Sequence, residues 1–202
     1  MTTRSPRLSR DAILDTARAM IVAQGIGAFS LRGLAARLGV TAPSLYRFFD
    51  SKDAIVASIA DAEFALLIDA IERAADAEVD PVEQIKMQST AYVECAVASP
   101  ALFAVMFAYR PPWLEDPGPA ELPLASKAWK LASSAVEAAI AQGSLRESDP
   151  VLASLTIWSA VHGVATLLTV GDPAAEQTID RALATSVIDA VVDGLAVRDS
   201  GP

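Results

Sequence analysis

The stretch SLRGLAARLGVTAPSLYRFFDSK, from Ser30 to Lys52, predicts two very short helices joined by a tight turn. The expected helices cover residues 31–38 and 42–48, and a Gly-Val pair lies between them. Gly39 can adopt the unusual backbone angle that such a turn requires. Helices of seven or eight residues are not stable alone in water, so they must pack against each other and against a neighbour. Two short helices packed in this way form a helix-turn-helix.

Polar residues stand where each of these helices should begin. Ser30 and Thr41 are placed to cap the two short helices, because hydroxyl oxygens accept hydrogen bonds from the free N–H groups of a first turn. Ser9 is placed in the same way before a helix expected over residues 10–24. Pro43 falls in a first turn, where its missing N–H does no harm.

The helix after the turn has two different faces. With Leu45 placed inward and 100° per residue, the residues that lie near it are Ala42, Phe48 and Phe49. The outward face and its flanks carry Pro43, Ser44, Tyr46 and Arg47. Arginine can form two hydrogen bonds with guanine, serine can bond to either kind of base edge, and proline can touch a thymine methyl group. We expect Thr41, Tyr46 and Lys52 to bind phosphates. The alternative is a helical corner with an ordinary solvated face.

The charge is divided unevenly along the chain. Up to Lys52 there are eight basic and three acidic residues, a net charge of +5, and the remainder carries −14. A small basic segment before a large acidic one favours contact of the first segment with phosphates. Together with the caps, this division favours DNA binding over the solvated corner.

The rest of the sequence also predicts helices, because apolar residues recur at spacings of three and four and strand signals are weak. The expected ranges are 52–77, 81–98, 100–109, 125–141, 150–170 and 175–197. The fold class is therefore all-α, with a three-helix head and a larger helical body. We place the boundary between a DNA-binding domain, 1–52, and a ligand-binding and dimerisation domain, 53–202.

Several functional classes receive little support. One cysteine, Cys95, excludes an internal disulfide and a cysteine metal cluster, and this fits a cytoplasmic protein. The sequence predicts no membrane span and no cofactor. One histidine with no nucleophile motif, phosphate loop or metal spacing argues against an enzyme, so no catalytic and no metal-binding residues are expected.

The segment FSLRGLAARLGVTAPSLYRFFDSKDAIV resembles the DNA-binding domain of TetR-type (tetracycline-repressor-like) transcriptional regulators. The resemblance covers about residues 9–56 and includes the aromatic-Ser opening, LA..LGV, SLYRFF and SKD. It implies an all-helical homodimer that binds operator DNA and releases it when a small molecule binds. Carried over to this sequence, the DNA contacts are Arg32, Thr41, Pro43, Ser44, Tyr46, Arg47 and Lys52.

A second resemblance lies further along the chain. YVECAVASPALFAVMF and IWSAVHGVATLL are similar to a C-terminal domain type named for a Trp…His-Gly signature, here Trp158, His162 and Gly163. This resemblance identifies no ligand.

Aromatic and sulfur-bearing side chains gather in the same region and could line an apolar cavity. The expected ligand-binding residues are Tyr92, Phe103, Met106, Phe107, Trp129, Trp158 and His162. His162 is the expected polar anchor, because neutral imidazole can donate and accept at once. Ordinary core packing is the alternative for each of these residues.

The last two helices are apolar on more than one face, which predicts a homodimer through a four-helix interface. The expected interface residues are Leu152, Leu155, Ile179, Leu183, Val187 and Val191. Such a dimer should select a near-palindromic operator. Two alternatives remain: a regulator whose body meets a protein partner instead of an apolar small-molecule effector, and a helical carrier or enzyme without DNA function.

Overall fold

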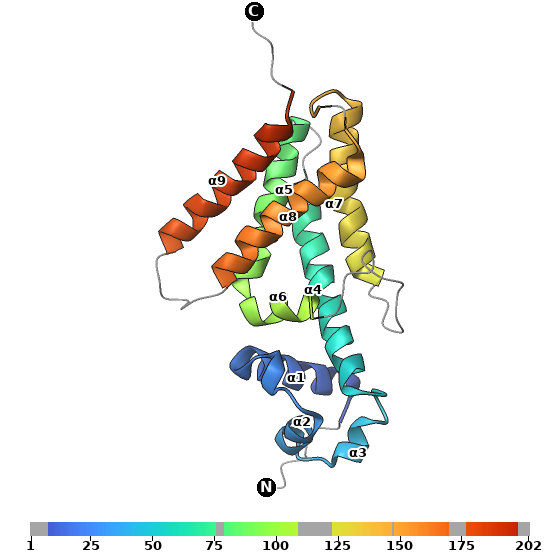
Figure 1. Ribbon diagram of the computed structural model, residues 1–202. Helices are drawn as coiled ribbons and strands as arrows, with labels where there is room; N and C mark the ends of the chain where they lie inside the picture. The colour runs from blue at the N-terminus through green and yellow to red at the C-terminus, as the bar shows by residue number, and fades with distance from the viewer. Residues whose placement is uncertain (1–7, 76–78, 109–122, 147, 170–176, 198–202) are drawn as a thin grey trace, which may run out of the picture. The chain divides into compact units, whose positions relative to one another are not determined.

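The structure is a computed structural model that describes residues 8–75, 79–108, 123–146, 148–169 and 177–197. Its helices are α1 (Arg10–Gln24), the 3₁₀ turn η1 (Ile26–Ala28), α2 (Leu31–Leu38), α3 (Ala42–Leu45), α4 (Lys52–Ala74), α5 (Pro81–Ala98), α6 (Pro100–Met106), α7 (Pro123–Ala141), α8 (Pro150–Thr169) and α9 (Gln177–Leu195) (Figure 1). The described residues otherwise hold turns and one isolated β-bridge, between Leu145 and Ala196. The prediction of an all-α fold is confirmed.

The chain forms two compact units. The first comprises Met1–Glu63 and Ala101–Leu122, and the second comprises Phe64–Pro100 and Pro123–Pro202. The division falls inside α4, so its first half belongs to one unit and its second half to the other.

The beginnings and ends of α1 and α2 follow the sequence prediction. The hydroxyl oxygens of Ser9 and Ser30 each accept a backbone N–H three residues on, at 3.1 and 3.2 Å. Gly39 ends α2 in the left-handed region, with φ of 68°. The backbone N–H of Val40 then bonds to the carbonyl of Ala35 at 2.9 Å, which closes the turn.

The third helix is shorter than predicted. α3 ends at Leu45, and residues 46–48 form a turn instead of helix. The N–H of Phe48 bonds to the carbonyl three residues back, at 2.9 Å, so the last turn is tightened. The predicted Thr41 cap is also wrong in detail, because its hydroxyl lies 2.9 Å from the Ser44 hydroxyl and caps no backbone N–H.

A small apolar core holds the first three helices together. Its fully buried side chains include Ile13, Ile21, Leu34 and Leu45, one or two from each helix. Each helix is too short to be stable alone, so this shared core fixes the geometry of the turn between α2 and α3.

In the second unit, α5, α7, α8 and α9 pack on one another (Figure 1). Lys86 of α5 forms ion pairs with Asp189 and Asp193 of α9, at 3.4 and 2.7 Å, and with Glu83 of its own helix. These contacts raise the pKa of Lys86. The pairing fastens α9 against α5.

Other helix bounds differ slightly from the prediction. α7 begins at Pro123, two residues early, and α6 ends at Met106, short of residue 109. The expected helix bounds at residues 77, 109, 170 and 175 lie outside the described residues.

α8 is the most apolar of the long helices in the part of the chain that the structure describes. It carries no Asp, Glu, Lys or Arg, an 18-residue window of it has a mean hydropathy of 1.7, and by length and composition alone it could cross a membrane. Helices in the core of a folded domain have the same property, and α8 packs against α5, α7 and α9.

Candidate functional site

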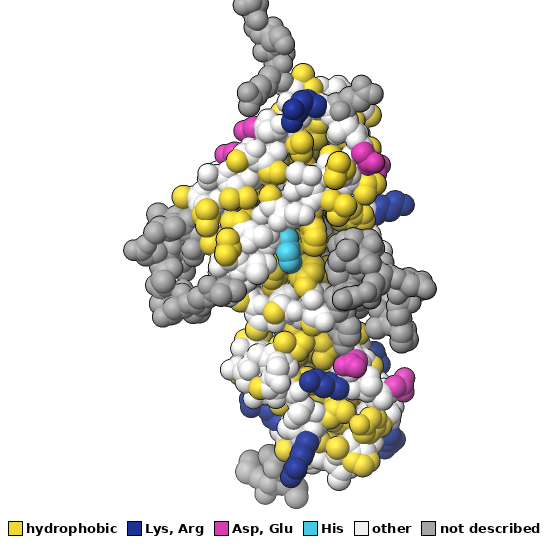
Figure 2. All heavy atoms as spheres, viewed as in Figure 1, with side chains coloured by type: hydrophobic (Ala, Val, Ile, Leu, Met, Phe, Trp, Pro, Cys, Tyr) yellow, Lys and Arg dark blue, Asp and Glu magenta, His cyan; other side chains and the backbone are white. Residues whose placement is uncertain are grey.

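The turn after α3 presents a polar face over a buried base. Leu45 and Phe49 are 1% and 4% exposed, whereas Pro43 and Arg47 are exposed and Tyr46 keeps 54% of its surface. The inward and outward positions therefore lie as the 100° rotation predicts. Figure 2 shows basic side chains, in dark blue, on the surface of the first unit.

The remaining predicted DNA contacts lie on α2, at the start of α3 and at the start of α4. Arg32 and Thr41 are exposed, and Ser44 is half-buried beside Thr41. Lys52 begins α4, half-buried, with its ammonium 5.7 Å from the centre of the Phe29 ring. All seven predicted residues belong to the first unit.

Arg10 is a residue that the sequence reasoning missed. Its guanidinium donates to the carbonyl of Phe48 at 3.0 Å and to the hydroxyl of Ser58 at 3.2 Å, and it lies 4.1 Å from the centre of the Phe49 ring. It therefore ties the first turn of α1 to the turn after α3 and to α4. The sequence signals only a basic residue after a cap, because its partners are 38 to 48 residues away.

A partly buried ion pair joins α1 to α4. Arg18 pairs with Glu63, whose side chain is 10% exposed. Burial raises the pKa of the Glu63 carboxyl, and the Arg18 charge lowers it by a smaller amount. The cost of removing the Glu63 carboxylate from water offsets most of the gain from pairing it with Arg18. The contact therefore fixes the position of α1 on α4 more than it adds stability.

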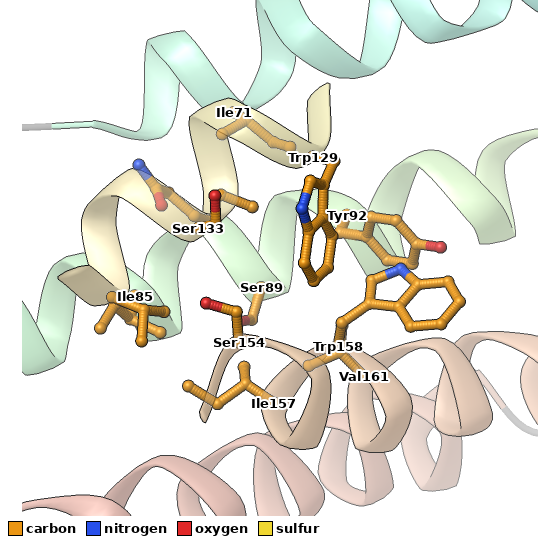
Figure 3. A pocket seen from close by; sticks show the side chains of 13 residues that line it. Ile71, Ile85, Ser89, Tyr92, Trp129, Ser133, Ser154, Ile157, Trp158 and Val161 are labelled. Atoms are coloured by element: carbon orange, nitrogen blue, oxygen red, sulfur yellow. The ribbon is translucent and has the colours of Figure 1, made fainter. Parts of the chain in front are cut away.

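The second unit contains a cavity of about 60 Å³ between α4, α5, α7 and α8. The lining side chains are all uncharged: Ile71, Ile85, Gln88, Ser89, Tyr92, Trp129, Ala132, Ser133, Val136, Ser154, Ile157, Trp158 and Val161. Figure 3 shows Tyr92, Trp129 and Trp158 together at one end of the cavity, and Ser89 and Ser154 also line it. The indole rings of Trp129 and Trp158 meet edge to face, with centres 6.5 Å apart.

Three side chains at the aromatic end form a hydrogen-bonded chain. The indole of Trp158 donates to the phenol oxygen of Tyr92, and that oxygen lies 2.8 Å from Nδ1 of His162. Burial lowers the pKa of His162, so its ring is neutral near pH 7. We assign the Tyr92 hydroxyl as the donor and Nδ1 as the acceptor, because a buried hydroxyl hydrogen needs a partner. The His162 ring also stacks on Trp158 at 4.9 Å.

The structure gathers only part of the predicted ligand set. Tyr92, Trp129 and Trp158 line the cavity, whereas His162 lies behind two of them and is not a lining residue. The other three predicted residues, Phe103, Met106 and Phe107, lie on or directly after α6, in the first unit. Apolar character alone predicted their inclusion, and it does not distinguish one apolar cluster from another.

The predicted dimer residues lie beside the buried stripes of α8 and α9. On α9 the buried residues are Ala184, Ile188 and Val192, while Leu183 is 39% exposed and Val187 and Val191 are half-buried. On α8, Leu152 is 64% exposed and Leu155 is half-buried. The side chain of Ile179 lies outside the described residues. Apolar side chains thus remain uncovered on both helices within one chain.

Within the described ranges, no group of three or more His, Cys, Asp or Glu side chains could hold a metal ion. Cys95, half-buried on α5, forms no disulfide within the described ranges.

Family comparisons cover both units. Residues 13–59 match the model of the family described as "Bacterial regulatory proteins, tetR family", and residues 85–191 match "Tetracyclin repressor-like, C-terminal domain". HTH-type transcriptional regulators of Mycobacterium bovis and Mycobacterium tuberculosis are 26% identical over 141 residues, which is 69% of this chain. The match spans 60% of the length of those relatives.

Solved structures share the fold over nearly the whole chain. A protein of unknown function from Rhodococcus sp. RHA1 is 26% identical, with a TM-score of 0.76 over 97% of this chain and 100% of its own. The regulator FadR of Bacillus subtilis, solved in complex with stearoyl-CoA, is 18% identical, with a TM-score of 0.73 over 93% of this chain and all of its own. PfmR of Thermus thermophilus is 22% identical, with a TM-score of 0.67 over 92% and 99%.

Proposed function

The chain belongs to the TetR family of bacterial regulatory proteins, and from this we propose that it is a cytoplasmic transcriptional regulator that binds DNA. The observation that carries the proposal is the exposed Tyr46–Arg47 face held over the buried Leu45 and Phe49. A face of this chemistry suits the major groove, and the net charge of +5 up to Lys52 attracts it to phosphates.

We assign the contacts by position on that face. Arg47 and Ser44 read base edges, Pro43 touches thymine, and the phosphate contacts are made by Arg32, Thr41, Tyr46 and Lys52. Residues 1–52 then act as the DNA-binding domain and residues 53–202 as the ligand-binding and dimerisation domain. The protein acts as a regulator and has no catalytic role.

Selection of bound sites from random duplex DNA tests the DNA proposal directly. Arg47→Ala should relax the preference at one base pair and cost about 1–3 kcal/mol there. Arg37→Ala removes an exposed arginine of α2 outside the proposed contact set and is the matched control. Equal weakening of all sequences by Arg47→Ala would exclude a base-reading role.

We also propose that two copies pair through α8 and α9, because both helices keep apolar side chains uncovered within one chain. The dimer would carry two recognition turns and select a near-palindromic operator. Leu183→Glu should yield monomers in light scattering and abolish tight operator binding. Ala182→Glu alters an exposed neighbour outside the proposed set and should leave the mass unchanged.

The regulatory signal is proposed to be a small apolar molecule that enters the cavity and releases the DNA. FadR of Bacillus subtilis, which shares the fold, was solved in complex with stearoyl-CoA, so a protein of this fold can bind a small molecule. An effector must bind the released state better than the DNA-bound state, by about 1.4 kcal/mol for each tenfold loss of DNA affinity. α4 has residues in both units and is the proposed route of coupling.

The Trp158, His162 and Gly163 signature supports a C-terminal domain of the Trp…His-Gly type as part of this proposal. The alternative is control by a protein partner. Thermal-shift measurements on the full chain with uncharged and charged small molecules separate the two, because a small effector raises the melting temperature as its concentration rises.

A further inference from the structure

The cavity described above has a chemistry that restricts what can occupy it. None of its thirteen lining side chains is charged, and Gln88, Ser89 and Ser154 are polar residues buried at its wall. A charged ligand would lose its hydration there without gaining an opposite charge, which is strongly unfavourable. The groove of about 550 Å³ beside α9, in contrast to the cavity, has charged side chains in its wall, namely Glu94 and Arg181.

The size of the cavity restricts the ligand further. A volume of about 60 Å³ is small beside the roughly 150 Å³ of a cavity that takes up benzene. It is smaller still than the roughly 300–1,000 Å³ of pockets for drug-sized molecules. A single ring is therefore the largest occupant that a modest separation of α5, α7 and α8 can admit.

The aromatic end indicates what kind of ring fits. Trp129 and Trp158 already meet edge to face, and Tyr92 lies beside them (Figure 3). A flat aromatic ligand can extend this arrangement with its own edge or face. The phenol of Tyr92 is not free to bind a ligand, because its oxygen is engaged by His162 and Trp158.

Ser154 offers a ligand a hydrogen-bond acceptor and no donor. Its hydroxyl donates to the carbonyl of Pro150 at 2.7 Å, so its hydrogen is occupied and its oxygen can only accept. The side chain is part of the cavity wall and is 4% exposed. A ligand that brings its own N–H or O–H group satisfies this oxygen.

We propose that the effector is a small uncharged aromatic compound with a single ring, of phenol type, with its ring against Trp129 and Trp158 and its hydrogen-bond donor on Ser154. This inference rests on the proposed ligand-responsive function and names the class of the ligand. His162 acts as a positioning residue that holds Tyr92 and Trp158, and it does not touch the ligand.

Isothermal titration of the full-length protein with four probes tests the class. p-Cresol carries the ring and the donor, toluene lacks the donor, 4-methylbenzoate adds a charge, and decanoate replaces the ring with a chain. p-Cresol should bind roughly five-fold more tightly than toluene and at least ten-fold more tightly than either anion. Equal or tighter binding of either anion, or no binding of p-cresol up to its solubility, would overturn the proposal.

Two variants of α8 locate the donor contact. Ser154→Ala should abolish the preference for p-cresol over toluene and leave toluene binding unchanged. Thr156→Ala removes the same kind of hydroxyl, which donates to Leu152 at 2.8 Å but is exposed, and should keep the preference. A preference that survives in Ser154→Ala would overturn the assignment of that oxygen.

Operator release distinguishes this inference from the function on which it rests. Binding of p-cresol with the expected preferences but without release of the DNA would refute the regulatory proposal alone. Release by decanoate or 4-methylbenzoate, with p-cresol inert, would refute the ligand class and retain the regulatory proposal.

Discussion

The turn after α3 exposes its polar groups to solvent, whereas the cavity between α4, α5, α7 and α8 buries them. The turn places Arg47 and Tyr46 in solvent and buries the apolar Leu45 and Phe49 beneath them. The cavity buries its polar atoms and contains no charge on its wall. Exposed charges attract a polyanion over a long distance, whereas a charge-free interior selects by exclusion. Two sites in one chain can therefore discriminate between very different partners.

The largest effect is expected where the exposed face depends on its buried base. Leu45→Ala should lower the free energy of unfolding by about 2–5 kcal/mol, because it opens a cavity under a helix of only four residues. Thermal denaturation followed by circular dichroism measures the loss. Tyr46→Ala, next to it and exposed, should change stability by no more than about 0.5 kcal/mol yet weaken DNA binding. Similar losses of stability in both variants would contradict the view that Leu45 supports the fold while Tyr46 serves DNA binding.

A smaller effect is expected for Arg10, which connects α1 to the same turn. Arg10→Ala removes two hydrogen bonds and a contact with Phe49, and should cost about 1 kcal/mol of stability. Operator affinity should fall as well, because the turn loses its fixed position. Filter binding or fluorescence anisotropy with duplex DNA measures this loss. If Arg10→Lys restored full affinity, charge alone would explain the role, since lysine lacks the planar fork.

Filling the cavity should raise the free energy of unfolding, whereas the two changes above lower it. Ala132→Val adds two carbon atoms to the lining of the cavity and should stabilise the second unit by about 0.5–1 kcal/mol. It should also abolish p-cresol binding and leave operator binding intact. Urea denaturation gives the stability change. A loss of more than about 1 kcal/mol would indicate that the space is already tightly packed.

The smallest effects concern pH, and the two units should respond in opposite directions. The pKa of Glu63 is raised, so its contribution to stability is present below its unfolded value near 4.5 and is lost as the pH rises through the folded pKa. The pKa of His162 is lowered, so its contribution is present above 6.5 and is lost as the pH falls through the folded pKa.

Amide hydrogen exchange in α1 and α8 across these pH ranges measures both trends. Glu63→Gln should remove the trend in α1 alone, and His162→Gln should remove the trend in α8 alone while still accepting the Tyr92 hydrogen bond. Loss of both trends in either variant would mean that the two groups titrate as a coupled pair.

Local chemistry made most of the first unit predictable. Ser9, Ser30 and Gly39 act through neighbours within five residues, so the ends of α1 and α2 could be read directly from the sequence. The end of α3 was missed because its tightened last turn is held by the long-range contact from Arg10 to the Phe48 carbonyl.

The cavity could be predicted only in outline. Tyr92 and His162 are 70 residues apart, and no local pattern shows that their side chains meet. The sequence identified the aromatic residues but could not assign Phe103 to the first unit or place His162 behind the wall. Composition shows that an apolar cluster exists, and only packing shows which members share a space.

The edge-to-face indole pair makes the protein its own optical probe. Trp129 and Trp158 are two of the three tryptophans in the chain, and both line the cavity. Trp158 also stacks on the single histidine, so its emission should respond to the protonation of that ring as well as to an occupant. An emission change on adding DNA alone would show that operator binding by the first unit changes the surroundings of the tryptophans at the cavity. Tryptophan emission thus gives a label-free measure of coupling between the two sites.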